Sequence, residues 1–280
     1  MKPFLGIISF AFFVLPSIAQ DGSDEATIRC YYRFSQKKDK SDKEFFSQDT
    51  LTLDIGSQMS CYYDESKMQK DSVFQSALAS LKPDRIESLS ILSSAESNVF
   101  DRSLGDTYRS NAYEQIYKNR RNGEIIMINT TSRGASFFDR YKGTDPIGAL
   151  NWTIEPDTAV FFDYPCQKAS LRFRGRDYEA WFSSQIPIND GPWKFFGLPG
   201  LILKVKDSEG QFDFECIGLE YLNTPYPIKI PEYKYFETNR KDYNKVMSSQ
   251  GGGTMINING GKIIIANIKT GTSVPLIELE

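Results

Sequence analysis

The sequence predicts a mainly β fold of the α+β class, a curved antiparallel sheet or open half-barrel with two or three helices packed on it. The 20 phenylalanines and 15 tyrosines give an aromatic content of 14%, and aromatic side chains favour strands. Between residues 152 and 221, strand-like runs follow one another with short turns between them, as in an antiparallel meander. No linker divides the chain, and its 280 residues suffice for one large core. We therefore expect a single domain over residues 20–280.

The first 19 residues have the features of a secretory signal peptide. Lys2 precedes an apolar run from Phe4 to Leu15, and Ser17 and Ala19 supply small residues at the −3 and −1 positions. The run is too short to span a membrane, so we expect cleavage after Ala19 and export of the remaining chain. An uncleaved anchor is the alternative. No later stretch is apolar enough to cross a bilayer, so an integral membrane protein is not expected.

The first half of the remaining chain carries several strand-like runs. Alternating, β-branched or aromatic residues predict strands at residues 27–34, 51–55, 59–63 and 136–141. The pair Asn122-Gly123 lies between two further runs, 114–117 and 125–128, and Asn-Gly is a strong hairpin signal. Residues 84–112 are mixed and polar, and they support no assignment.

Two helices are predicted. Residues 64–81 show apolar side chains at helical spacing, followed by the helix-ending pair Lys82-Pro83. The apolar face of this helix consists of Phe74, Leu78 and Leu81. Residues 237–249 are predicted to form a second helix, and the glycines 251–253 that follow it predict a flexible break.

The second half of the chain is dominated by the predicted meander. Its strands are expected at residues 152–154, 159–164, 167–174, 176–183, 201–206 and 211–221. Gly175 and residues 208–210 supply turns between neighbouring strands. A last strand is expected at residues 263–268.

Composition excludes several kinds of chemistry. Because the chain has no histidine, it cannot use Ser-His-Asp or Cys-His catalysis, or a histidine-containing metal site. A net charge of −3 without a long basic run argues against nucleic-acid binding. Its glycines do not form a phosphate-binding pattern. A carboxylate site for calcium or magnesium remains open, but nothing in the sequence points to one, so no cofactor or metal is expected.

Four cysteines agree with an oxidising destination. They are Cys30, Cys61, Cys166 and Cys216. Two disulfides could form, and four cysteines allow three connectivities that spacing alone does not separate. Buried free thiols are the alternative, whereas a metal site is less favoured because no C-x-x-C pair is present.

The most distinctive stretch, residues 191–206, reads GPWKFFGLPGLILKVK. Its glycines and prolines predict a constrained corner, and Leu201, Leu203 and Val205 alternate as in a half-buried strand. None of its residues is a nucleophile or a general base. The residues expected to have this structural role are Gly191, Pro192, Gly197, Leu198, Pro199, Gly200, Leu201 and Ile202. We expect them to fix the path of the chain into the strand.

A predicted hairpin next to this stretch offers a candidate binding surface. Its residues are Arg172, Arg174, Arg176, Tyr178 and Trp181. Guanidinium groups on one strand face could bind a phosphate, carboxylate or lipid headgroup, but they could equally belong to a charged, solvated hairpin. The nearby aromatic side chains, including Trp193, Phe195 and Phe196, could line a cavity for an apolar ligand or form the core.

Acidic residues also cluster in this region, so a two-carboxylate hydrolase has to be considered. The acids are Asp157, Asp163, Asp177 and Glu179. Their proximity in sequence does not place any two of them at a catalytic separation, and Ser183-Ser184 has no base partner. The sequence therefore assigns no catalytic residue.

Residues 197–202 spell GLPGLI, and the chain resembles the GLPGLI family of exported bacterial proteins. Further segments that resemble this family are residues 53–56, 60, 63, 164–169, 173–181, 186–192 and 275–279. The chain departs from the family pattern at Asp163-Tyr164-Pro165, where a glycine usually precedes the tyrosine. The resemblance implies export to the periplasm or cell envelope of a two-membrane bacterium. It implies no activity or catalytic residue, because none is established for the family.

The leading functional hypothesis is a non-enzymatic exported protein that binds an apolar or amphipathic ligand or a partner protein. A lipid, a peptide or an envelope protein would fit this description, and nucleic acid would not. A histidine-free two-carboxylate hydrolase is one alternative, and a structural component of the envelope is another.

Overall fold

The computed structural model describes residues 23–37, 41, 43–44, 47–69, 72, 88–92, 107–109, 114–133, 136–248, 254–259, 262–267 and 277–279. Most of them belong to one twelve-stranded sheet with the order β14-β8-β7-β6-β3-β2-β1-β13-β12-β11-β10-β9. In chain order its strands are β1 (Ser23–Gln36), β2 (Ser47–Ile55), β3 (Met59–Tyr63), β6 (Gln115–Asn119), β7 (Glu124–Arg133), β8 (Ser136–Pro146), β9 (Thr153–Phe161), β10 (Tyr164–Phe173), β11 (Arg176–Ser183), β12 (Leu201–Asp207), β13 (Phe212–Lys229) and β14 (Phe236–Asn239). A separate four-stranded sheet has the order β4-β16-β15-β5, with β4 (Ser88–Leu92), β5 (Thr107–Arg109), β15 (Thr254–Asn259) and β16 (Lys262–Asn267).

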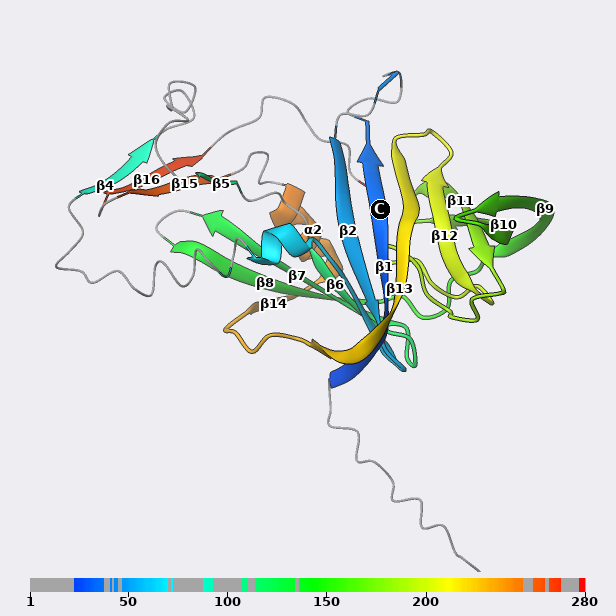
Figure 1. The fold of residues 1–280 in the computed structure, drawn as a ribbon. Coiled ribbons are helices and arrows are strands. Elements are labelled where there is room, and N and C mark those ends of the chain that lie inside the picture. Colours follow the sequence, from blue (N-terminus) through cyan, green and yellow to red (C-terminus); the bar gives the residue numbers. More distant parts are fainter. Residues whose placement is uncertain are drawn as a thin grey trace, which may run out of the picture.

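The large sheet is strongly twisted and open. Strands β2, β1 and β13 run through its middle, with β6–β8 and β14 on one side and β12–β9 on the other (Figure 1). The two terminal strands, β14 and β9, are not paired with each other, so the sheet does not close into a barrel. The helix α2 (Arg240–Ser248) directly follows β14, and residues 65–69 form a short helical segment. No helix in the described ranges is long and apolar enough to span a membrane.

The predicted mainly β fold and its meander are confirmed. Strands β9 to β13 are consecutive antiparallel neighbours. The Asn122-Gly123 hairpin is also confirmed, since it joins β6 to β7, and Gly123 has the positive φ of 67° that this turn requires.

The predicted helices agree only in part with the structure. The second one begins at Arg240, because residues 237–239 extend β14 and Asn239 caps the helix by accepting a hydrogen bond of 3.0 Å from the backbone N–H of Asp242. Of the first predicted helix, only residues 64–69 and 72 are described, so its apolar face lies outside the described residues. The unassigned stretch 84–112 contributes β4 and β5.

The core lies mainly against one face of the large sheet and is unusually aromatic. Trp193, Phe195 and Phe196 are buried in it, with 6% or less of each exposed. Phe195 is at its centre, packing edge-on against Tyr178 with ring centroids 4.8 Å apart. Five aromatic rings surround Phe195 within 6.4 Å, those of Trp152, Phe173, Tyr178, Trp193 and Phe214. These aromatic residues therefore fill the core instead of lining a cavity.

The possible disulfides are absent, and all four cysteines are free and buried. Cys61 belongs to a core cluster that contains no other cysteine, so it has no partner within reach. Cys30 and Cys216 are on the neighbouring strands β1 and β13, but Cys30 is opposite Leu219 and Cys216 is opposite Tyr32. Burial raises the pKa of every one of these thiols, to about 11 for Cys216. They behave as small apolar core residues.

Candidate functional site

The GLPGLI stretch is held against the sheet by its backbone. The N–H of Leu201 donates to Ile186 O at 2.9 Å, and the N–H of Ile202 donates to Asp190 O at 3.0 Å. Gly200 packs directly on the main-chain carbonyl of Ser183, in a space that no side chain could enter. Trp152 Nε1 donates to Phe196 O at 2.7 Å. The stretch is therefore a fixed corner between β11 and β12.

A buried ion pair fixes the start of this corner. Asp190 is fully buried and forms ion pairs with Lys118 and Arg120 of the β6–β7 hairpin. Burial alone would raise the pKa of Asp190, but the two cations outweigh it and hold the pKa below its usual value. Lys118 also donates to the carbonyl of Gly191. The ion pairs of Asp190 thus connect the corner to the β6–β7 hairpin, which is on the other side of β1 in the sheet.

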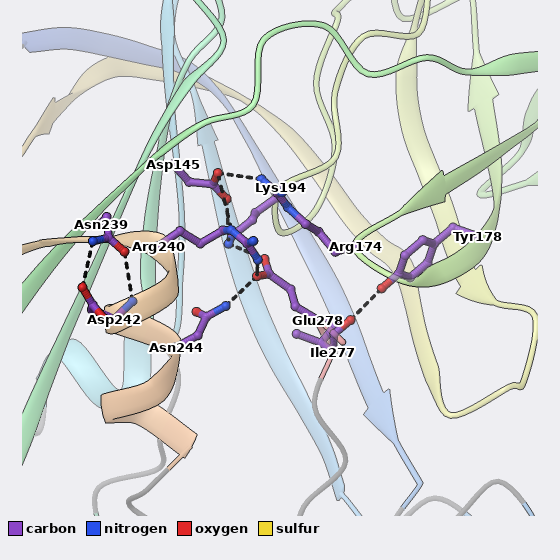
Figure 2. Close-up of polar contacts among 10 residues, drawn as sticks. All are labelled: Asp145, Arg174, Tyr178, Lys194, Asn239, Arg240, Asp242, Asn244, Ile277 and Glu278. Atoms are coloured by element: carbon purple, nitrogen blue, oxygen red, sulfur yellow. Dashed lines mark hydrogen bonds and ion pairs between the residues drawn. The ribbon is translucent and has the colours of Figure 1, made fainter. Parts of the chain in front are cut away.

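A second charged cluster surrounds Lys194, near the start of the stretch (Figure 2). We call it the C-terminal cluster, and it consists of Asp145, Arg174, Lys194, Arg240, Asn244 and Glu278. Lys194 is 1% exposed and lies between the carboxylates of Asp145 and Glu278. Arg174 pairs with Asp145 at 2.7 Å. Arg240 pairs with Glu278 at 3.0 Å, and Asn244 donates to the same carboxylate at 2.7 Å.

The acids near Lys194 differ in how readily they ionise. Burial opposes ionisation of Glu278, but Lys194, Asn244 and Arg240 outweigh it, so its pKa is lowered. Burial raises the pKa of the neighbouring Glu114, and Lys194 only partly offsets this. Within the described ranges, no group of three or more acids or cysteines has the geometry to hold a metal ion. The cluster is arranged to neutralise a buried carboxylate.

Glu278 is held through its flanking residues as well. The N–H of Leu279 donates to Arg174 O at 3.0 Å, and Tyr178 Oη donates to Ile277 O at 3.0 Å. Arg174 and Gly175, which form the tight turn between β10 and β11, both have positive φ, 50° and 79°. The β10–β11 hairpin therefore contributes a carbonyl, a hydroxyl and a guanidinium to one small region.

The five residues of the predicted binding surface do not form one surface. Arg172 is exposed and pairs with Asp177 at 2.9 Å, whereas Arg176 is buried and pairs with Asp207 at 3.0 Å. Trp181 is partly exposed and donates to Glu179 at 3.1 Å. Arg174 and Tyr178 come together only at the C-terminal segment, as described above.

The acids considered for hydrolysis are similarly dispersed. Asp177 pairs with Arg172, and Glu179 pairs with Lys168 and Lys206. Asp157 is exposed on β9, and Asp163 is exposed in the turn that follows it. The structure therefore brings no two of these four acids together around a common cleft.

Two further features of the described surface bear on binding. A shallow depression of about 420 Å³ is lined by Pro187, Asn189, Gly197, Leu198 and Pro199. The second feature is β9, the nine-residue terminal strand of the large sheet. Ile154, Val160 and Phe162 on or next to β9 are 48%, 69% and 42% exposed.

Sequence reasoning missed the residues that matter most in the C-terminal cluster. Asp145 and Arg240 are far from the motif in sequence, and nothing in their local pattern distinguishes them from surface charges. Lys194 offered a signal, because a lysine flanked by Trp193 and Phe195 is unusual in an apolar run. The PLIEL sequence at residues 275–279 is distinctive only through its resemblance to the family, and it does not indicate that Glu278 is buried.

Comparison with known proteins supports the family resemblance over a short segment and the fold over most of the chain. A family model described as "Protein of unknown function (Porph_ging)", the GLPGLI-type domain family, matches residues 173–204. No curated protein sequence matches the chain. Two structures of PNGF-II, in space groups P21 and C2, resemble it with TM-scores of 0.52 and 0.50 and identities of 13% and 14%. Each comparison covers 84% of this chain but only 35% of PNGF-II. At this identity the likeness concerns the fold alone.

Proposed function

We propose that the chain is an exported, non-enzymatic protein of the periplasm or cell envelope that binds an extended segment of a partner protein along β9. The observation that carries this proposal is that β9 is a nine-residue strand at the edge of the large sheet. An unpaired edge of a sheet presents backbone N–H and C=O groups to which another strand can add. At the opposite end of the sheet, β14 is only four residues long, and a short edge strand is a common protection against such pairing.

The side chains of β9 define where a partner strand would add. Ile154, Thr158 and Val160 alternate on its more exposed face, while Phe161 packs against Trp181 with ring centroids 5.4 Å apart. The pairing of β9 with β10 is irregular between Ile154 and Thr158, where Pro156 removes one backbone donor. We therefore assign the added strand to the whole of β9, with a local irregularity at Pro156.

The interior of the protein favours a partner protein over a small apolar ligand. The aromatic side chains that could have lined a ligand cavity pack against one another in the core. The acids that could have served a hydrolase are paired with cations or are dispersed over the surface. These observations support binding at the exterior.

Site-specific photo-crosslinking tests the proposal. A photoreactive amino acid replaces Val160 in the full chain in the source cells, and Glu209, an exposed position on the β12–β13 turn, serves as the matched control. We expect a discrete protein adduct from position 160 that is absent from position 209. Val160→Lys, combined with a crosslinker at position 158, should abolish the adduct and leave the melting temperature unchanged. Identical adducts at both positions, or no adduct at position 160, would contradict the proposal. A small apolar molecule released in native mass spectrometry would favour the ligand hypothesis instead.

A further inference from the structure

The segment Ile277–Leu279 contacts the rest of the molecule in the way that a bound peptide does. It makes no ladder with any strand among the described residues, and its backbone is held at two points, by Tyr178 Oη and by Arg174 O. Between these points the Glu278 carboxylate is bound by Lys194, Arg240 and Asn244. Main-chain hydrogen bonds combined with one specifically bound side chain are typical of the recognition of extended peptides.

Two of the groups that bind Glu278, Lys194 and Arg240, have a second partner that does not depend on the segment. Asp145 pairs with Arg174 at 2.7 Å, with Lys194 at 3.4 Å and with Arg240 at 4.0 Å. Apart from Glu278, the acids at this place are Asp145 and the neighbouring Glu114, and they face three cations. This leaves an excess of positive charge where Glu278 docks. Such a site keeps its structure without the ligand, and its charge is opposite to that of the ligand. It is therefore preorganised for binding.

The contacts also define what the site selects. Ile277 packs against the main core, and Glu278 is 8% exposed. Leu279 is 58% exposed and is bound through its N–H, so its side chain contributes little to recognition. The ligand is therefore a short segment in which an apolar residue is followed by a glutamate.

We propose that Arg174, Tyr178, Lys194, Arg240 and Asn244 form a peptide-binding site for such a segment, and that the chain's own residues 277–279 are its ligand. The cis-docked segment is a separable ligand rather than an integral part of the sheet. This inference is independent of the partner-binding role assigned to β9.

The test separates the segment from the folded chain. A specific protease site is inserted between residues 272 and 273, the full chain is folded, and it is then cleaved. The released peptide of residues 273–280 is removed by dilution and gel filtration. Binding of a fluorescent copy of this peptide is measured by anisotropy, together with a copy carrying Glu278→Gln. We expect saturable binding of the first peptide and at least tenfold weaker binding of the second.

Two substitutions on α2 provide a test variant and its matched control. Arg240→Gln removes a group that contacts Glu278 and should weaken binding of the peptide, whereas Lys241→Gln, at the exposed neighbouring position, should not. Equal binding of both peptides, or failure of the folded, cleaved protein to bind either, would overturn the proposal. Unfolding of the protein when the peptide leaves would overturn it too, because the segment would then be an integral part of the fold.

Discussion

At the scale of single residues, Gly200 shows how strictly the GLPGLI corner is constrained. Its α-carbon lies so close to the carbonyl of Ser183 that an added methyl group would overlap the backbone oxygen. We expect Gly200→Ala to destabilise the fold by at least about 3 kcal/mol, and Gly200→Val to reduce the yield of folded protein further. The matched control is Gly210→Ala, where φ is 66° but the space is open, so the cost should be about 1 kcal/mol. Equal urea midpoints for the two alanine variants would contradict this prediction.

Glu278 makes the stability contributed by the C-terminal cluster depend on pH. Its pKa is lowered in the folded state, so folding favours the ionised form. The resulting stabilisation is complete above the unfolded pKa of about 4.3 and is lost as the pH falls through the lowered folded value. Asp190 acts in the same direction, whereas Glu114, with its raised pKa, acts in the opposite one.

We therefore expect the wild-type protein to lose more stability than Glu278→Gln when the pH is lowered from 7 to 3. At pH 7 the substitution should cost about 3 kcal/mol, because it removes one of the two carboxylates that neutralise the buried Lys194. Urea titrations of both proteins at the two pH values measure the difference. If the difference in free energy of unfolding between the two proteins were the same at pH 7 and pH 3, the pKa of Glu278 would not change on folding.

At the scale of elements, the β10–β11 hairpin carries three arginines in different environments. Arg172 pairs with Asp177 in solvent, whereas Arg176 is 6% exposed and bound by Asp207 and Gln211. We expect Arg172→Ala to change the free energy of unfolding by less than about 1 kcal/mol and Arg176→Ala by about 3–5 kcal/mol. Thermal melts of the two variants compare them directly. Similar melting temperatures would mean that the hairpin is not anchored as described.

These arginines also show what the sequence could predict. The alternation of residues 167–183 was sufficient to place the hairpin and its turn, because strand pairing between neighbours is a local property. It did not show that Arg176 faces inward and Arg172 outward, although both lie two positions from Arg174. Their environments depend on Asp207 and Asp177, and only the register of β11 with its two neighbours determines which acid is near. The C-terminal cluster was unpredictable for the same reason, since its members meet only in the tertiary structure.

At the scale of the whole molecule, the reactivity of the four cysteines measures how readily the core becomes accessible to solvent. Burial and raised pKa values make each thiol unreactive in the folded protein. We expect a thiol reagent to modify none of them at pH 8 in buffer and all four in denaturant without reductant. Fewer than four modified thiols in denaturant would reveal a disulfide. Rapid modification in buffer would show that the core opens readily.

The central position of β1 in the sheet has a consequence for how the protein folds. One of its neighbours, β2, follows it directly, but the other is β13, whose Glu220 accepts a hydrogen bond from Tyr31 across 189 positions of sequence. Such long-range pairing makes folding slow, because the chain must close a very large loop before these contacts can form. Until β13 has been synthesised, one side of β1 has no strand to pair with and could pair with other chains. Slow completion of the sheet would keep the chain unfolded during translation. On the proposal that the chain is exported, this is the state in which it could pass through a narrow membrane channel.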